Sequence, residues 1–417
     1  MKKVLVIVYY WPPSGGAGVQ RWLKFVKYLP NFGWLPTVIT TQDGDYPAID
    51  NSLLAEVPEG IKVIRTKTPT FGKLFIRTND QKIPYGSLET KKGDSLFKKI
   101  TFWIRLNLIV PDARKVWNRF AFQAASKELR TVQYNAIVTS GPPHSTHLIG
   151  LKLKEKFHLK WIADFRDPWT KIDYLEKVKR HPFTEKMDKK LEVKVIAQSD
   201  FILSINQKIL QDLGADQKGK IIPNGFDPAD FWGIEKEKTE NFEINYFGNI
   251  TRERDPAIVL KAVNQLFTNN SKIQMNFWGN VAEEVKTELI KLDDNKLINF
   301  FNYIPHCKVL QKMVNSSLLL LLINDVPDNK GILTGKIYEY LGVQAPILGI
   351  GPADGEAAAI LQETKAGKMF GYEDQQNVAD FIFQQYSLWK TGQSSAVSCK
   401  IEKFSRIEQT KELAKIL

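Results

Sequence analysis

The residues best suited to chemistry lie in one short stretch, residues 331–342, with the sequence GILTGKIYEYLG. It follows an apolar run at 318–323 that predicts a buried strand, and Gly342 and Pro346 would end a helix of two turns. A strand, loop and helix in this order place free backbone N–H groups and the positive end of a helix dipole at one point. Thr334, Gly335 and Lys336 therefore form a candidate phosphate site, to which Lys336 would add a full positive charge.

Glu339 lies three residues after Lys336, and so on the same face of the predicted helix. A cation for phosphates and a carboxylate for hydroxyl groups, one turn apart, would suit the diphosphate and the ribose of a nucleotide. The plainer alternative is that Lys336 and Glu339 form an ordinary ion pair on a helix surface. The spacing fits both interpretations.

Two further turns between a strand and a helix are candidate phosphate contacts. Residues 3–9 predict a first buried strand, and Gly15 and Gly16 follow it in a loop before a helical pattern at 19–29. Such a loop is where a doubly wound sheet approaches a phosphate or a sugar. Residues 243–249 predict a later strand whose loop carries Arg252 and Arg254 ahead of a helix.

Polar residues also follow two strands in the first half of the chain. His144 comes shortly after a strand at 135–139, and Asp164, Arg166 and Asp167 follow a strand at 160–163. Because parallel strands end at the same edge of a sheet, we expect these side chains to line a binding crevice. His144 and Asp167 are the candidates for orienting a sugar or an acceptor, beside Asp164 and Arg166. The alternatives are a structural loop histidine and a network in which the three charged residues pair with one another.

The segment 70–130 departs from the alternation of strands and helices. It interleaves basic residues with large apolar ones, a pattern typical of a helix in a membrane interface, and the candidates are Lys98, Lys99, Phe102, Trp103 and Arg105. If the acceptor is lipid-linked, they could hold the protein at an anionic leaflet. The alternative is a solvated basic face on a helix whose apolar side belongs to the core.

Length and composition bound the class of protein. The 417 residues are too many for one hydrophobic core and suit two domains of roughly 200 residues each. Apolar and charged fractions of 43% and 25% are those of a globular protein. A net charge of +12 favours an anionic partner, namely nucleic acid, a membrane surface or a phosphorylated substrate. No nucleic-acid recognition motif is visible, so we expect no nucleic-acid partner.

Cysteine use and the N-terminal segment indicate a cytoplasmic protein. Cys307 and Cys399 lack metal-ligand spacing, as expected of a reduced protein, and no segment approaches the ~18–20 apolar residues of a membrane span. The start MKKVLVIV has no cleavage site after it, which favours a strand over a signal peptide. We expect no metal, because there is no Asp-x-Asp between a strand and its loop and no His/Cys cluster.

The remaining predicted elements continue the alternation. Pro223, Asn224 and Gly225 break the pattern strongly, and we place the boundary between domains 1–223 and 224–402 there. The other strands are predicted at 36–41, 61–65, 200–205, 220–222, 272–278, 297–301 and 344–349, and the other helices at 145–156, 171–190, 206–213 and 403–417.

Two halves of this kind, joined near Asn224, have the architecture of the GT-B fold. The chain resembles a bacterial glycosyltransferase of family 4 over nearly its whole length. The motifs are Gly15-Gly16, PNGFD at 223–227, YFGN at 246–249, NYIPH at 302–306 and TGKIYEYLGVQAPIL at 334–348. SGPPHSTH at 140–147 and ADFRDPW at 163–169 resemble a subgroup that acts on surface glycans.

The resemblance implies two Rossmann-like doubly wound domains facing across a cleft, an acceptor domain at 1–223 and a donor domain at 224–402, with helix 403–417 packing back on the first. It also implies retaining, metal-independent transfer from a UDP- or GDP-linked sugar to a glycan or polyprenyl-linked acceptor, with no other cofactor. Glu339 matches the carboxylate that binds the donor ribose, 334–336 match the loop that meets the nucleotide sugar, and Gly16 matches the glycine that faces the donor phosphates. His144 matches a histidine that lines the sugar site.

The chain departs from the family pattern at two positions. Gly331 stands where the family has the first of two glutamates, and Asp325 or Asp328 could take its place. Asn249 stands where the family has an arginine, so Arg252 or Arg254 must serve. The rival interpretations are a nucleotide-sugar epimerase and a non-catalytic relative that binds a glycan or a nucleotide sugar. The expected location is the cytoplasm, at the inner face of the plasma membrane if the basic segment binds lipid.

Overall fold

The computed structural model describes residues 1–46, 48–68, 103–104, 106–172, 178, 180–267, 271–302, 304, 306–393 and 398–417. The chain divides into two compact units. Unit 1 comprises Met1–Pro223 and Ile407–Leu417, and unit 2 comprises Asn224–Arg406. Across the described ranges, no helix combines the length and the apolar character needed to cross a bilayer.

Unit 1 contains a seven-stranded parallel sheet in the order β3-β2-β1-β4-β5-β6-β7. Its strands are β1 (Lys2–Val8), β2 (Trp34–Thr41), β3 (Lys62–Thr66), β4 (Ala136–Gly141), β5 (Lys160–Phe165), β6 (Phe201–Ser204) and β7 (Gly219–Ile221). Its helices are α1 (Ala17–Tyr28), α4 (Asn118–Thr131), α5 (Ser145–Phe157), α7 (Pro182–Gln198) and α8 (Gln207–Leu213), and most of α15 (Arg406–Ile416) belongs to it. The chain order steps outward from β1 in both directions, as in a doubly wound sheet.

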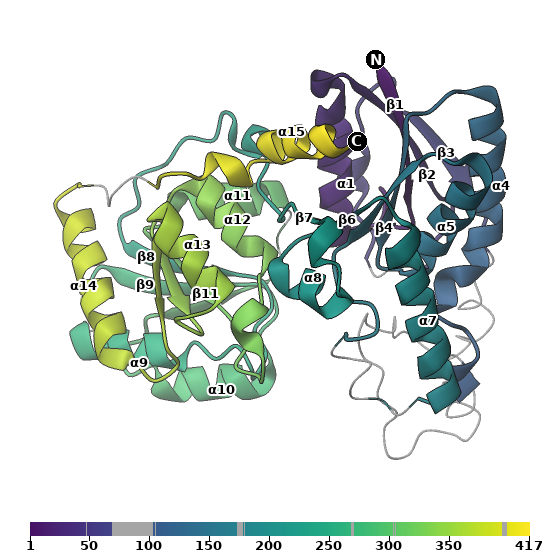
Figure 1. The fold of residues 1–417 in the computed structure, drawn as a ribbon. Helices are drawn as coiled ribbons and strands as arrows, with labels where there is room; N and C mark the ends of the chain where they lie inside the picture. The colour runs from purple at the N-terminus through teal and green to yellow at the C-terminus, as the bar shows by residue number, and fades with distance from the viewer. Residues whose placement is uncertain are drawn as a thin grey trace. The chain divides into compact units, whose positions relative to one another are not determined.

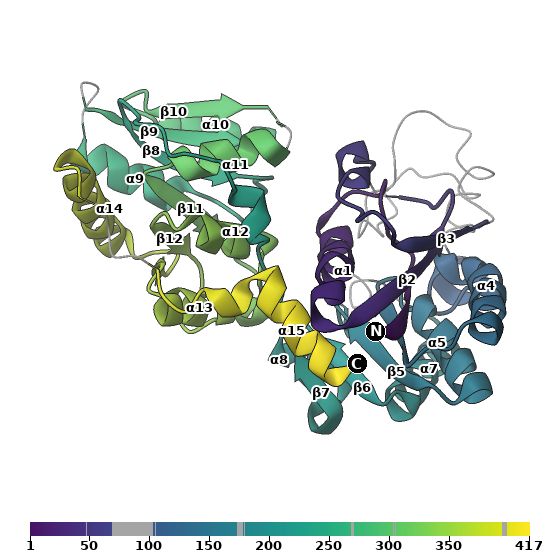
Figure 2. The ribbon, with the colours of Figure 1, turned by 90° about the horizontal axis from the view of Figure 1, so that it is seen from above.

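Helices cover both faces of this sheet. Helices α4, α5 and α7 lie on one face, while α1 lies on the other and α15 runs beside it (Figures 1 and 2). Leu413 of α15 is fully buried in the same core as the strands, and Glu412 forms an ion pair with Lys220 at 3.4 Å. The last helix of the chain thus completes the core of unit 1.

Unit 2 contains a six-stranded parallel sheet in the order β10-β9-β8-β11-β12-β13. Its strands are β8 (Phe242–Phe247), β9 (Ile273–Trp278), β10 (Ile298–Phe301), β11 (Leu318–Leu322), β12 (Ile347–Ile350) and β13 (Gly367–Phe370). Its helices are α9 (Ala257–Leu266), α10 (Glu283–Leu292), α11 (His306–Asn315), α12 (Gly335–Val343), α13 (Glu356–Thr364) and α14 (Gln375–Lys390).

Strand β11 shows why the sheet of unit 2 needs helices on both faces. Side chains alternate along a strand, and a strand covered on both faces is apolar throughout. Leu318, Leu320 and Leu322 lie in one buried cluster with α9 and α14. Leu319 and Leu321 lie in the other cluster, with α11, α12 and α13. The apolar run that preceded the candidate phosphate loop in the sequence is therefore the centre of the sheet that positions it.

The structure corrects three predicted boundaries. The charged helix predicted at 171–190 continues past residue 190 to Gln198 as α7, which has Pro182 in its first turn. Residues 173–177 and 179 of the predicted range lie outside the described residues. Asp164 was predicted to follow β5, but it lies within that strand, one residue before its end. The predicted tail segment 403–417 is divided, because residues 403–406 belong to unit 2 and residues 407–417 to unit 1.

Candidate functional site

The N-terminus of α12 is the centre of the candidate site in unit 2. A short 3-10 turn at Asn329–Gly331 follows β11, and α12 then begins at Gly335 after Thr334. Its first turn contains no acidic residue, and Gly335 is exposed with open space beside its Cα. The buried Thr334 hydroxyl has no hydrogen-bond partner among the described residues. A helix end of this kind, open and without a carboxylate, suits an anion.

The Lys336 ammonium group lies over the aromatic ring of Tyr246, on the neighbouring strand β8. Its Nζ donates a hydrogen bond to the Tyr246 hydroxyl at 3.1 Å and lies 4.7 Å from the ring centroid. The Tyr246 hydroxyl in turn donates to the Asn249 carbonyl at 3.0 Å. Burial, followed by the charge of Arg254, lowers the pKa of Lys336 to about 8, and Glu339 partly offsets this. The lysine is thus held in place and only weakly solvated.

Gly248 makes room for that lysine. The residue follows β8 with φ +121°, and a Cβ atom there would lie 2.5 Å from Lys336 Cε. A side chain at this position would therefore meet strain in the backbone and a clash with the lysine. The glycine of the YFGN motif is needed for the position of Lys336, which the sequence alone did not reveal.

The four other predicted donor residues on the loop after β8 and on α12 have different surroundings. Arg254 donates from Nε to the Asn324 side chain at 2.5 Å, and its charge acts on Lys336. Arg252 and Asn249 are exposed. Glu339 is half-buried on α12, close enough to Lys336 to act on its pKa. The Lys336 ammonium therefore donates to Tyr246 and is also acted on by the charge of Glu339.

The position of the missing glutamate lies in the turn just before α12. Gly331 ends the 3-10 turn Asn329–Gly331. Asp325 and Asp328, the two possible substitutes, are both exposed, and Asp328 has φ +56°. The Asp325 N–H donates to the Glu253 carbonyl at 2.7 Å, which ties this turn to the loop after β8.

In unit 1, His144 is a buried and neutral histidine at the start of α5. Its Nε2 lies 3.2 Å from the Pro168 carbonyl, so Nε2–H donates and Nδ1 is left as an acceptor. Nδ1 has no hydrogen-bond partner among the described residues. The ring stacks on Trp169 at 5.2 Å with an interplanar angle of 8°. Burial lowers the pKa of His144 to about 3.

Helix α7 fixes the ring on which His144 stacks. The Trp169 indole N–H donates to the buried carboxylate of Asp188 at 2.8 Å, and Arg180 donates to the same carboxylate at 2.7 Å. Burial raises the pKa of Asp188, and the hydrogen bond and charge of Arg180 oppose that rise. Asp188 therefore holds Trp169 in place, and Trp169 in turn positions His144.

A second histidine lies beside the first. His147 is fully buried, and its Nδ1 lies 2.9 Å from the Thr139 hydroxyl, which also accepts from the Trp161 indole N–H at 2.9 Å. Burial, together with His144 and Arg166, holds the pKa of His147 well below its ordinary value. A Cβ at Gly141 would lie 2.7 Å from His147 Nε2 and 3.0 Å from His144 Nδ1. This glycine allows both imidazoles to approach the loop.

Asp164 belongs to the interior of unit 1 and not to a binding surface. It is fully buried and forms an ion pair with Arg21 of α1 at 3.0 Å. Trp22 Nε1 and the Ser140 hydroxyl both donate to it at 2.7 Å. Arg21 also donates to the carbonyls of Ile222 and Pro223. The structural-network alternative therefore describes Asp164, although its partners are not the ones that the sequence indicated.

Arg166 joins two of the predicted loops. Its guanidinium donates to the carbonyls of Gly141 at 3.2 Å and Pro142 at 2.7 Å. A Cβ at Gly18, in the first turn of α1, would lie 2.1 Å from its Nη1, so the loop after β4 and the start of α1 meet at this side chain. Asp167 follows it and is half-buried.

The two glycines in the loop before α1 differ in exposure: Gly15 is buried and Gly16 is exposed. The N–H of Gly15 donates to the Ala48 carbonyl at 3.0 Å. Gly16 precedes α1 with φ +101°, is exposed, and has open space beside its Cα. The first turn of α1 has no acidic residue. Gly16 is thus the residue of this pair that a ligand could approach.

Most of the predicted membrane-surface residues, Lys98, Lys99, Phe102 and Arg105, lie outside the described residues. Trp103 is described, is helical and is 51% exposed. No cluster of three or more metal-ligating side chains occurs in the described part of the chain.

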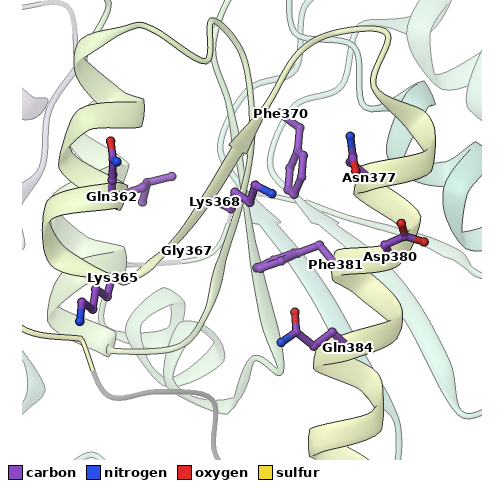
Figure 3. Close-up of a pocket in the computed structure, with 10 residues that line it drawn as sticks. Gln362, Lys365, Gly367, Lys368, Phe370, Asn377, Asp380, Phe381 and Gln384 are labelled. Carbon is purple, nitrogen blue, oxygen red and sulfur yellow. The ribbon is translucent and has the colours of Figure 1, made fainter.

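A separate hollow of about 460 Å³ lies between α13 and α14, over the edge strand β13 (Figure 3). Its lining includes Lys365, Lys368, Asp380 and Phe381. None of its lining residues belongs to α12 or to the loop after β8, so it is not the candidate site.

Comparison with known proteins identifies the fold. No protein-family model matches the chain, and no sequence among the curated proteins matches it significantly. Among solved structures, Anabaena Alr3699/HepE in complex with UDP matches with a TM-score of 0.60 and 12% identity, over 100% of this chain and 99% of that one. The lipopolysaccharide outer core galactosyltransferase WaaB matches with a TM-score of 0.57 and 12% identity, over 99% and 98%.

A third similar structure is described as a UDP-N-acetylglucosamine 2-epimerase from Listeria monocytogenes. It matches with a TM-score of 0.53 and 12% identity, over 99% of this chain and 95% of that one. The chain has the GT-B fold. The predicted fold class, two Rossmann-like parallel-sheet domains, is therefore confirmed. At these identities the similarity concerns the fold, and function must be argued from the sites.

Sequence reasoning did not find several residues that position these sites. Tyr246 and Trp169 lie within the YFGN and ADFRDPW motifs, but neither motif predicts its contact with Lys336 or His144. Arg21 and Asp188 fall within predicted helices and carry no signal of a role in a site. The YFGN motif contains both Tyr246 and Gly248, and it was the sequence signal that could have indicated their role in the site. The contacts of Arg21 and Asp188 join distant positions, which no local pattern marks.

Proposed function

We propose that the protein is a glycosyltransferase that moves a sugar from a nucleotide-diphosphate sugar to a glycan or lipid-linked acceptor in bacterial surface polysaccharide synthesis. The observation that carries the proposal is the placement of Lys336 on Tyr246, at the open N-terminus of α12. A weakly solvated ammonium beside helix N–H groups would neutralise the charge that develops on a leaving diphosphate.

The proposed reaction is retaining and metal-independent, as in the surface-glycan subgroup of glycosyltransferase family 4. The bond between the anomeric carbon and the phosphate oxygen breaks, and the nucleoside diphosphate leaves with the electron pair. The acceptor oxygen bonds to the anomeric carbon, and its proton passes to the leaving phosphate. Lys336, Arg254 and the α12 N-terminus hold the diphosphate, while Glu339 binds the ribose.

In this proposal unit 1 supplies the groups that meet the sugar and the acceptor. His144 presents an unprotonated Nδ1 that accepts a hydrogen bond from a hydroxyl group, since its Nε2–H is used by Pro168. Asp167 orients the acceptor. The protein would act in the cytoplasm, at the membrane surface where a lipid-linked acceptor lies.

The test is a calorimetric and thermal-shift screen with UDP-, GDP-, ADP- and CMP-linked sugars, followed by a transfer assay on lipid-linked glycan acceptors. A ligand that binds only the native state raises the melting temperature according to its affinity. One nucleotide should stabilise the protein, and Lys336→Ala should abolish that shift. No binding of any nucleotide sugar would reject the proposal.

An epimerase is the second candidate, because one similar structure is assigned as a UDP-N-acetylglucosamine 2-epimerase. Product analysis separates the two: a transferase releases the nucleoside diphosphate, whereas an epimerase returns a nucleotide sugar with one inverted carbon. A protein that binds the donor but yields neither product would be a non-catalytic relative, in keeping with Gly331 at the glutamate position.

A further inference from the structure

Four large apolar side chains are exposed on two short segments of unit 1. Trp103, Ile104 and Leu108 are 51%, 40% and 64% exposed, and Phe183 in the first turn of α7 is 69% exposed. Large apolar residues gathered on a surface mark a site of contact with a partner.

Buried polar contacts join the two segments and fix this exposure. The Asn107 side chain accepts from the His181 N–H at 2.7 Å, and its carbonyl accepts from the Thr184 hydroxyl at 2.9 Å. Asn107 and Thr184 are both buried. Leu108 follows Asn107 and Phe183 precedes Thr184, so these two exposed side chains flank a single hydrogen bond. Their exposure is therefore a property of the fold.

Lysines continue this surface along α7. Phe183, Lys186, Lys190 and Val193 are spaced by three, four and three residues, which places them on one helix face, and all four are exposed. Lys186 and Lys190 have no ion-pair partner among the described residues, whereas Lys189 pairs with Glu192 and Lys194 with Glu155. The exposed Glu185 lies two positions from Phe183, and so toward the opposite side of the helix.

We propose that this surface, formed by Trp103, Ile104, Leu108, Phe183, Lys186, Lys190 and Val193, docks unit 1 on anionic phospholipid. Aromatic and aliphatic side chains that enter the acyl boundary, beside lysines that meet the headgroups, are the chemistry of an interfacial helix. Exposed lysines argue against a protein partner, because lysine is depleted at protein interfaces. Docking of this surface would bring the enzyme to a lipid-linked acceptor, and this purpose rests on the proposed function.

The test is sedimentation of the full chain with phosphatidylcholine vesicles, with and without phosphatidylglycerol, at low and high salt and without any nucleotide sugar. The wild type should bind the anionic vesicles at low salt. The double variant Leu108→Ser/Phe183→Ser should lower the vesicle partition coefficient by at least about tenfold. The double variant Lys186→Glu/Lys190→Glu should lower it by at least about tenfold as well, since each lysine near an anionic surface contributes about fivefold.

Two control variants test whether the loss of binding depends on where the substituted residues lie and not only on their type. Lys127→Glu/Lys152→Glu makes the same change of charge on exposed residues of α4 and α5, and Phe383→Ser removes an exposed aromatic residue from α14. Both should keep wild-type binding, and all variants should keep the wild-type melting temperature. A wild type that fails to bind anionic vesicles, or controls that lose binding equally, would overturn the proposal. Donor affinity, measured separately by calorimetry, shows whether the proposed function itself has failed.

Discussion

The ammonium group of Lys336 and the hydroxyl group of Tyr246 lie 3.1 Å apart, with the ammonium over the tyrosine ring. Lys336 lies in the first turn of α12 and Tyr246 lies in β8, and the two elements meet at the carboxyl edge of the sheet. The tyrosine thus holds the ammonium group in one orientation. A charged group that is already oriented needs little reorganisation when an anion binds, and it therefore stabilises the bound anion more strongly.

The pH dependence of nucleotide binding should report this lysine. Because burial and Arg254 lower the pKa of Lys336 to about 8, the free protein loses the ammonium charge as the pH rises through 8. UDP or GDP affinity should therefore fall between pH 7 and pH 9.5, by up to about tenfold per pH unit. Lys336→Met should bind at least about tenfold more weakly at pH 7.

Calorimetry of both proteins across this range checks the expectation. Ionisation of the nucleotide itself affects both equally, so the difference between them isolates the lysine. Equal pH dependence in the two proteins would remove Lys336 from the phosphate site.

Gly248→Ala should impair binding without touching a ligand. Its Cβ would lie 2.5 Å from Lys336 Cε, and φ at this residue is +121°. We expect a loss of about 1–3 kcal/mol in unfolding free energy and a nucleotide affinity close to that of Lys336→Met. Gly371→Ala is the control, since no atom beyond Gly371 and its two chain neighbours lies within 4 Å of the added Cβ and φ is not positive there. Urea denaturation and calorimetry on both variants give the two quantities, and a Gly248→Ala protein with full affinity would contradict this geometry.

The two buried histidines should make unit 1 sensitive to acid. Burial lowers the pKa of His144 from 6.5 to about 3, and lowers that of His147 as well. Between these values the unfolded chain binds more protons than the folded one, so the unfolding free energy falls as the pH drops below 6.5. Each histidine contributes a slope of up to about 1.4 kcal/mol per pH unit.

Urea denaturation at pH 5, 6 and 7 measures this slope, and His144→Asn should reduce it by about half. The exposed His158, changed to Asn, is the control and should leave the slope unchanged. Activity should show no step from His144 between pH 5 and pH 8, and turnover of His144→Ala should fall at least about tenfold. A folded His144→Ala protein with wild-type turnover would remove this residue from the site.

Local patterns revealed the sheets well, because a strand buried on both faces leaves a continuous apolar run such as 318–323. They also located the turn before Lys336, since glycine and the end of the apolar run mark it. They could not reveal the partner of Asp164, because Arg21 lies 143 positions earlier and reads as a polar residue on an amphipathic helix. Nor could they show that Asp188, in a lysine-rich helix, would hold Trp169 against His144. Contacts between distant segments decide which polar residues of a strand end face a ligand and which hold the fold.

The buried ion pair between Arg21 and Asp164 provides a test of that distinction. Both side chains have no exposed surface, and the carboxylate also accepts hydrogen bonds from Trp22 and Ser140. Asp164→Asn leaves a buried guanidinium without its counter-charge, so we expect a loss of about 3–5 kcal/mol in unfolding free energy. Glu155→Gln breaks the exposed pair with Lys194 and should cost less than about 1 kcal/mol. Urea denaturation of both variants at pH 7 makes the comparison. If Asp164→Asn unfolded like the wild type but lost acceptor turnover, the residue would serve the reaction and not the fold.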